Sequence, residues 1–220
     1  MNDLLASLAA NADQIGIALA ETGYMLAFSL VAAVAIGLPL GVTIFLTRPG
    51  GALERKPIWR IANLYVSVIR SFPFLLLVVF LIPLTRALYG TTFGTEAATF
   101  PLCFVGVAIY ARLVEQILLE IPPGVLQAAR SMGADVRQTV MHFLLVEGRS
   151  GLVYALTSAA ISLISYSTVL GIVGGGGIGA TLLTSFDRYE YDSAAAILLI
   201  IIGIVFAVEY TSGHIRKRVQ

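Results

Sequence analysis

Long uncharged apolar stretches constrain this fold more than any other feature of the sequence. Tyr24 to Thr47 and Gly151 to Phe186 contain no Asp, Glu, Lys or Arg. A helix needs about 20 apolar residues to cross the hydrocarbon core of a bilayer. Of the 220 residues, 58% are hydrophobic and 12% are charged, whereas about 25% are charged in soluble domains. The sequence therefore predicts an all-α integral membrane protein.

Five membrane crossings are expected, which places the two termini on opposite sides. The second crossing is interrupted between Arg70 and Phe74, and we expect Arg70 and Arg86 to extend towards opposite interfaces, with Arg70 at the inner one. In the first crossing, Gly37 and Gly41, with the proline between them, should kink the helix or admit a close neighbour. The five stretches are Tyr24–Thr47, Ile61–Tyr89, Ala97–Leu119, Gly151–Phe186, which a run of glycines breaks, and Ser193–Thr211.

The basic residues indicate the orientation. With five crossings, three basic segments share one face, and the positive-inside rule places that face in the cytoplasm and the N-terminus outside. Residues 1–20 contain no Lys or Arg, so we expect no signal peptide and a retained first crossing. The basic residues of the three segments are Arg48, Arg55, Lys56 and Arg60, then Arg130, Arg137 and Arg149, and finally Arg216, Lys217 and Arg218.

The stretch "VLQAARSMGADVRQTVMH", residues 125–142, interrupts this apolar sequence with small and polar residues. Pro123 suits the first turn of a short helix, Gly133 suits its end, and Asp135 can cap a second helix. At helical spacing, the apolar stripe of the first helix is Val125, Leu126, Ala129 and Met132. The stripe of the second is Val136, Val140, Phe143 and Leu144. The pattern predicts a helix, a glycine corner and a helix that returns to the membrane.

Two functions fit this corner equally well on pattern alone. Small side chains around Gly133 would let a short helix enter a groove on another protein. Alternatively, the segment is a plain cytoplasmic elbow that packs on its own chain.

The segment resembles the cytoplasmic coupling loop of ABC-importer permeases, whose signature is EAA, three residues, Gly, nine residues and I-x-L-P. Gln127, Ala128 and Ala129 occupy the EAA positions, Gly133 falls at the required spacing, and residues 143–146 stand at the I-x-L-P end. The acid of EAA is therefore Gln127 here, which lacks the charge for a salt bridge. Val146 replaces the terminal proline, so the second helix can continue.

Four further stretches make the chain resemble the methionine ABC-importer permease family along nearly its whole length. They are "LTRPGG" at 46–51, "IRSFPFLLLVVFLIPLTR" at 69–86, "LLEIPPGVLQAARSMGA" at 118–134 and "YSTVLGIVGGGGIG" at 166–179. The resemblance implies a type I ABC-importer permease fold. Residues 1–20 would be a periplasmic segment, 21–213 the permease domain with its coupling loop at 120–147, and 214–220 a basic cytoplasmic tail.

The resemblance also implies an assembly in the inner membrane. Its parts would be two copies of this chain, two cytoplasmic ABC ATPase subunits and an extracytoplasmic methionine-binding protein, surrounded by lipid and without nucleic acid. No cofactor is expected on this subunit, because ATP would be bound by the ATPase. The implied coupling residues are Pro123, Val125, Leu126, Gln127, Ala128, Ala129, Arg130, Met132, Gly133, Ala134, Val136 and Val140.

For the substrate path we expect hydroxyl and apolar side chains on the fourth crossing. The residues concerned are Ser165, Tyr166, Ser167 and Val169, with Ser71, Phe72 and Pro73 beside them, and the glycines Gly174, Gly175, Gly176 and Gly177 as the outer gate. Hydroxyl groups of this kind also serve as hydrogen-bond partners between membrane helices, and a run of glycines also occurs in a loose connecting turn. Both alternatives remain open at this point.

Other functions lack their motifs. "GGGGIG" at 174–179 satisfies G-x-G-x-x-G, but only seven residues separate it from Asp187, too few for the helix and strand of a dinucleotide site. No Walker motif is present, and the single cysteine and the distant His142 and His214 give no metal or catalytic cluster. The uncharged spans argue against an ion-coupled carrier. An importer of another small solute, a self-contained channel or carrier, and a non-transporting scaffold remain alternatives.

Overall fold

A computed structural model describes residues 11–219, and their side chains up to residue 215. Within this part every regular element is helical. The elements are α2 (Ala12–Ala32), the π-helical turn η1 (Ala33–Gly37), α3 (Leu38–Thr47), α4 (Lys56–Ser71), α5 (Phe74–Tyr89), α6 (Thr95–Glu120), α7 (Pro123–Ser131), α8 (Val136–Gln138), the π-helical turn η2 (Thr139–Leu144), α9 (Leu145–Glu147), α10 (Arg149–Leu170), the 3-10 turn η3 (Gly171–Val173), α11 (Gly177–Asp187) and α12 (Tyr191–Val219).

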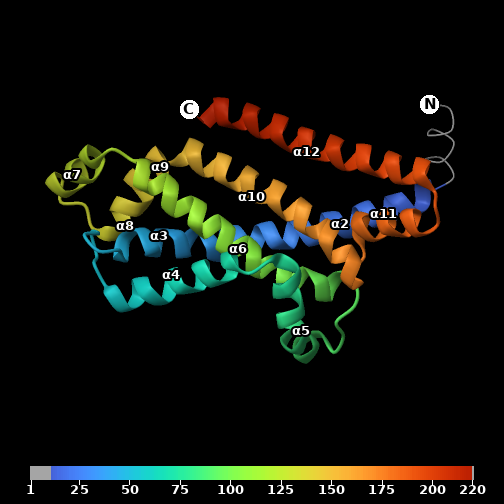
Figure 1. The fold of residues 1–220 in the computed structure, drawn as a ribbon. Coiled ribbons are helices and arrows are strands. Elements are labelled where there is room, and N and C mark those ends of the chain that lie inside the picture. Colours follow the sequence, from blue (N-terminus) through green and yellow to red (C-terminus); the bar gives the residue numbers. More distant parts are fainter. Residues whose placement is uncertain (1–10, 220) are drawn as a thin grey trace.

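Four helical segments are long and apolar enough to cross a membrane. They are Ala12–Thr47, Thr95–Glu120, Arg149–Val173 and Tyr191–Ile215, and the bent pair α4–α5 provides a fifth crossing if it counts as one broken span. The start of α2 and the end of α12 lie at opposite ends of the bundle (Figure 1). This arrangement agrees with the odd number of crossings expected from the sequence.

The helix of the first crossing begins earlier than the sequence indicated. Residues 12–20 are the first turns of α2, which continues through η1 and α3 as one segment of 36 residues. At 1.5 Å per residue this segment is longer than the hydrocarbon core is thick, so part of it extends beyond the core. The first ten residues of the expected periplasmic segment, and the side chains of the basic tail from residue 216 onward, lie outside the described residues.

Helix α6 forms the centre of the bundle. It packs against α2, α3, α4, α5 and α10 (Figure 1). Of its most apolar stretch 56% is buried, whereas in α12 the figure is 17%. Since α12 packs mainly on α10 and α11, most of its apolar surface is left for lipid or for another chain.

Two glycines bring α3 and α6 into close contact, as the sequence predicted. A Cβ atom built on Gly37 would lie 2.9 Å from the carbonyl oxygen of Val107, and one on Gly41 would lie 2.5 Å from that of Ala111. The π-helical turn that ends at Gly37 lies beside Pro39, which has no N–H to continue the α-helical pattern. The glycine pair therefore allows the two backbones to approach more closely than any larger residue would.

The second expected crossing is two helices joined at a sharp bend. Phe72 and Pro73 are extended, so α4 ends at Ser71 and α5 begins at Phe74, at an angle of 116°. A residue before proline is disfavoured in the helical region, which explains the break at this place. Arg70, expected at the inner interface, lies just before this bend and lines a cavity together with residues of α6 and α10.

The fourth expected crossing ends earlier than its uncharged sequence indicates. The helix stops at Val173, and the glycines that follow turn the chain into the separate helix α11, which packs on α2, α10 and α12. The break at the glycines is therefore confirmed, and the residues after it form a separate helix. With 11 residues, α11 is too short to span a bilayer.

The close contact between α3 and α6 yields a stability prediction. In Gly41→Ala the added methyl group would overlap with Ala111 and with Val114 Cβ, 2.7 Å away, so we expect a loss of about 1–3 kcal/mol of stability. Gly203→Ala is the matched control, because a Cβ there meets nothing within 4 Å. Thermal unfolding of the purified variants in detergent would measure both. Equal midpoints would contradict the close packing of α3 on α6.

Candidate functional site

The short helix α7 ends in a closed glycine turn. Gly133 adopts a φ of 72°, its N–H donates to the carbonyl of Arg130, and the N–H of Ala134 donates to that of Ala129, each at 3.0 Å. These two bonds define a Schellman motif, which satisfies the last carbonyls of the helix. Pro123 occupies the first turn, as predicted. The corner is therefore fixed by backbone geometry that requires a glycine at position 133.

The second helix of the corner begins with a capping box. The N–H of Gln138 donates to the Asp135 carboxylate at 2.7 Å, and the N–H of Asp135 donates to the Gln138 side chain at 2.9 Å. This confirms the predicted cap at Asp135. The elements α8, η2 and α9 then follow without a gap up to Glu147, passing through Val146. The exit helix thus continues at the position where the signature has a proline.

Only part of the predicted stripe of α7 faces its own chain. Ala129 is fully buried, and Leu126 and Val140 pack against the cluster that includes Leu118 and Leu144. Met132, predicted on the same stripe, is 66% exposed, because the helix ends at Ser131 and the side chain leaves the helical spacing. Val125 is half-buried and Val136 is exposed. The exposed surface of the corner is formed by Pro123, Gly124, Gln127, Ala128, Arg130, Ser131, Met132, Gly133, Asp135, Val136, Arg137, Gln138, Met141 and His142.

A cavity of about 300 Å³ opens where the break between α4 and α5 meets α6 and α10. From the break it is lined by Arg70, Phe72 and Phe74, of which Phe74 stacks on Tyr166 with ring centroids 4.6 Å apart. Its remaining lining residues are Ile69 on α4, Val105, Ile109 and Leu113 on α6, and Ser158, Ser162 and Tyr166 on α10. The three residues of α10 recur every fourth position, so they share one helical face.

Of the residues expected along the substrate path, the structure brings Phe72 and Tyr166 together in this cavity. Ser167 is buried, and its hydroxyl donates to the carbonyl of Ile164 in its own helix. Ser165 and Ser71 are exposed, and each donates to a carbonyl four residues earlier. Val169 packs against the central apolar cluster, and Pro73 is exposed. Ser158 and Ser162 were not predicted from the sequence, although their spacing of four residues from each other and from Tyr166 places all three on one helical face.

The glycine turn at the outer end is held by α2. Gly174, Gly176 and Gly177 have positive φ values, and Gly175 is too close to Ala98 for a side chain. The N–H groups of Gly177 and Ile178 donate to the side chains of Glu21 at 2.6 Å and Thr22 at 2.9 Å. Two of the backbone N–H groups that the break frees are therefore satisfied by side chains of α2.

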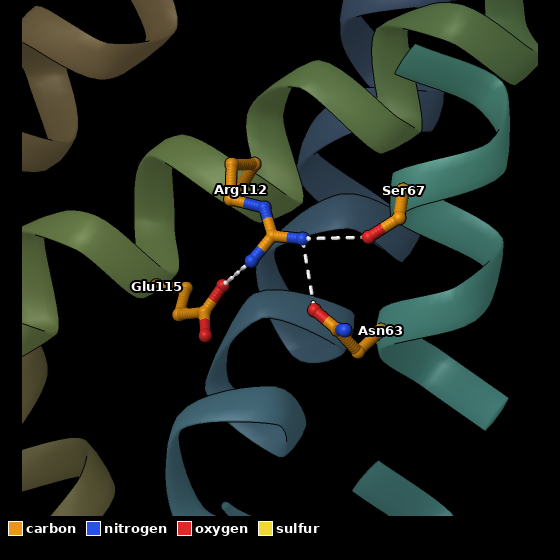
Figure 2. A network of polar contacts seen from close by, with 4 residues as sticks. All are labelled: Asn63, Ser67, Arg112 and Glu115. Carbon is orange, nitrogen blue, oxygen red and sulfur yellow. Dashed lines mark hydrogen bonds and ion pairs between the residues drawn. The ribbon is translucent and has the colours of Figure 1, made fainter. Parts of the chain in front are cut away.

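A polar network joins α4 to α6 inside the apolar bundle (Figure 2). Arg112 donates to Glu115 at 2.6 Å, to Asn63 at 2.8 Å and to Ser67 at 3.2 Å. The side chains of Arg112 and Glu115 are only 20% and 10% exposed. Charges at this depth are costly unless paired, and here the pairing fixes α4 against α6. The i, i+3 spacing of Arg112 and Glu115 was visible in the sequence, but the hydrogen-bond partners of Arg112 on α4 were not.

These features define a multi-pass membrane protein. One of its helical segments, α4–α5, is broken at a cavity, and the helix–glycine–helix corner at α7 is exposed. Residues 37–220 fit the model of the family described as "Binding-protein-dependent transport system inner membrane component". The chain belongs to this family, and it is thus the membrane permease component of a transport system rather than an enzyme.

Individual relatives extend over the whole chain. The probable D-methionine transport system permease protein MetI of Vibrio cholerae serotype O1 is 36% identical, over 100% of this chain and 98% of that protein. The counterpart from Pasteurella multocida is 37% identical, over 93% and 94% respectively. A chain of the MetNI methionine ABC transporter, solved in an inward-facing conformation, superposes with a TM-score of 0.90 at 34% identity, over 96% of this chain and 98% of that chain. The expected type I importer fold is therefore confirmed.

The network around Arg112 yields a second stability prediction. Arg112→Met would leave the Glu115 carboxylate without its cation, and we expect a loss of about 3 kcal/mol. In the double variant R112M/E115L no unpaired charge remains, so part of that loss should be recovered. The measurement is the midpoint of thermal unfolding in detergent. A double variant less stable than R112M would show that the pair does not act as described.

Proposed function

We propose that this chain is the permease subunit of an ATP-driven importer that carries methionine across the inner membrane. The observation that carries the proposal is the match, over the whole chain, to a D-methionine permease. The cavity supports it, since an apolar wall with few polar groups suits an amino acid with a thioether side chain. Another small solute carried by the same architecture is the nearest competing function.

The proposed orientation places the corner at α7 in the cytoplasm and the glycine turn outside. Arg48, Arg130, Arg137 and Arg149 belong to the end of the bundle that carries α7, whereas the opposite end carries the glycine turn and Glu190 (Figure 1). This bias follows the positive-inside rule. The inner membrane is proposed because the relatives are bacterial.

We assign the exposed corner to docking on an ATPase subunit. A short helix can bind in a groove through side chains three and four residues apart, and the exposed face of α7 offers small or flexible residues such as Ala128, Ser131 and Met132. Gln127 replaces the signature acid, so shape rather than charge should carry the contact. ATP-dependent closure of two ATPase subunits would draw two such corners together and shift the permease from inward-facing to outward-facing.

The assembly we propose contains two copies of this chain, two ATPase subunits and an extracytoplasmic methionine-binding protein. Helix α5 projects from the bundle (Figure 1), and Leu76, Val79, Phe80 and Leu88 on it are exposed. Closed twofold symmetry is the commonest way for such a surface to be covered. A second copy would also complete the wall of the cavity.

The proposal is tested by uptake of radiolabelled methionine into proteoliposomes that contain the chain, its ATPase and its binding protein. We expect uptake only with ATP, unaffected by collapse of the proton gradient. Uptake of another solute but not of methionine would identify a different cargo. Uptake that continues without the ATPase would contradict the mechanism, and failure of the ATPase to co-purify would favour a scaffold.

The role of the corner is tested by Gly133→Val. A Cβ at Gly133 meets nothing within 4 Å, so the variant's effect comes from its φ of 72°, which a β-branched residue adopts only at a cost of about 1–2 kcal/mol. We expect normal insertion and continued ATP hydrolysis with at least a tenfold loss of uptake. Gly50→Val is the matched control, because Gly50 has a φ of 74° and equally open surroundings outside α7. Normal uptake by G133V would contradict the docking role.

A further inference from the structure

The cavity at the break between α4 and α5 contains a positive charge without a counter-charge. Arg70 lines it and is exposed there. The Arg70 guanidinium makes no hydrogen bond or ion pair with any residue that the structure describes, and no Asp or Glu lines the cavity. This contrasts with Arg112, one layer away on α6, whose three polar partners satisfy it. Arg70 is therefore free to bind a ligand.

The position of the cavity makes this charge unusual. It faces Val105 and Ile109, in the central turns of α6, and Ser162, in the centre of α10. Both helices are candidate membrane spans, so the cavity lies at about mid-depth of the bundle. An arginine at that depth is costly to keep, and in membrane proteins such residues usually mark a substrate pathway. Broken helices at mid-depth are the usual location of transporter binding sites.

The other polar groups of the cavity complete a small polar patch. The hydroxyls of Ser158 and Tyr166 have no hydrogen-bond partner among the described residues, and Ser162 donates to the carbonyl of Ser158, which leaves its oxygen as an acceptor. The last carbonyls of α4 also end here, without helical partners. Phe72, Phe74 and aliphatic residues of α6 form the apolar wall of the cavity.

We propose that Arg70 binds the carboxylate of the transported amino acid in this cavity. A guanidinium binds a carboxylate through two parallel hydrogen bonds, a geometry that no other side chain provides. The ammonium group is bound by the free hydroxyls of Ser158 and Tyr166 and by the carbonyls at the end of α4. The apolar wall takes the side chain. A volume of about 300 Å³ is at the lower limit for small-molecule sites, as suits a single amino acid.

This inference rests on the proposed function, because it assumes that the cargo is an amino acid. A purely structural role is the competing explanation, since a cation in the last turn of α4 also interacts favourably with the helix dipole. The two roles differ in one respect. A carboxylate site discriminates between ligands with and without a carboxylate, whereas a dipole contact does not.

The first test measures uptake by Arg70→Met and Arg70→Lys in the complete complex with its binding protein. We expect at least a tenfold lower uptake rate in R70M and an intermediate rate in R70K, which keeps the charge but loses the paired geometry. The complex should still assemble and hydrolyse ATP. Arg60→Met is the matched control, because Arg60 is an exposed arginine on the same helix, α4, that does not line this cavity. Uptake by R70M within twofold of the wild type would overturn the proposal.

The second test measures ligand binding to the complex without its binding protein, by saturation-transfer NMR with millimolar methionine and methionine amide. The wild type should prefer methionine over the amide at least tenfold, and R70M should bind the two equally. A preference retained in R70M, or absent from the wild type, would overturn the carboxylate site. If wild-type complex transports a different solute and no methionine, the proposed function fails instead, and the two failures are thereby distinguished.

Discussion

The constraint on which this structure depends is that a backbone in hydrocarbon must satisfy its own hydrogen bonds. Continuous helices meet this constraint by themselves, so each interruption needs local compensation. At the outer glycine turn, Glu21 and Thr22 supply acceptors for two freed N–H groups. At the corner after α7, a Schellman motif and a capping box close both helix ends. The break at Phe72 and Pro73 differs, because the groups that it frees face a cavity.

The described helices connect this cavity to the corner. Helix α6 lines the cavity with Val105, Ile109 and Leu113 and then leads directly into α7. Helix α10 leaves the corner and lines the cavity with Ser158, Ser162 and Tyr166. The Arg112 network fixes α4, which carries Arg70, to α6 (Figure 2). In the mechanism proposed above, a displacement of α7 would be passed to two walls of the cavity and to Arg70.

Much of this fold was predictable where a residue has one dominant local property. Gly133 and Asp135 fixed the corner because a positive φ and an N-cap have few alternative residues. Gly37 and Gly41 indicated a close helical contact without identifying α6 as the partner, and the glycine run indicated the break after α10. The cavity beside Arg70 was not predictable, because it depends on the bend of 116° between α4 and α5, and the sequence around Pro73 indicates a break without its angle. Likewise, the partners of Arg112 on α4 depend on how two helices pack, which no local pattern contains.

The most direct test of this account is the distance between the two α7 helices in the assembled transporter. A spin label at Ser131→Cys, in a chain whose Cys103 is replaced by Ser, would report it by double electron–electron resonance. Ser131 is exposed on α7, and Cys103 is the single native cysteine. The distance should be shorter with ATP and the binding protein than in the nucleotide-free state, and G133V should lose this difference. A distance that ATP leaves unchanged in the wild type would contradict this account.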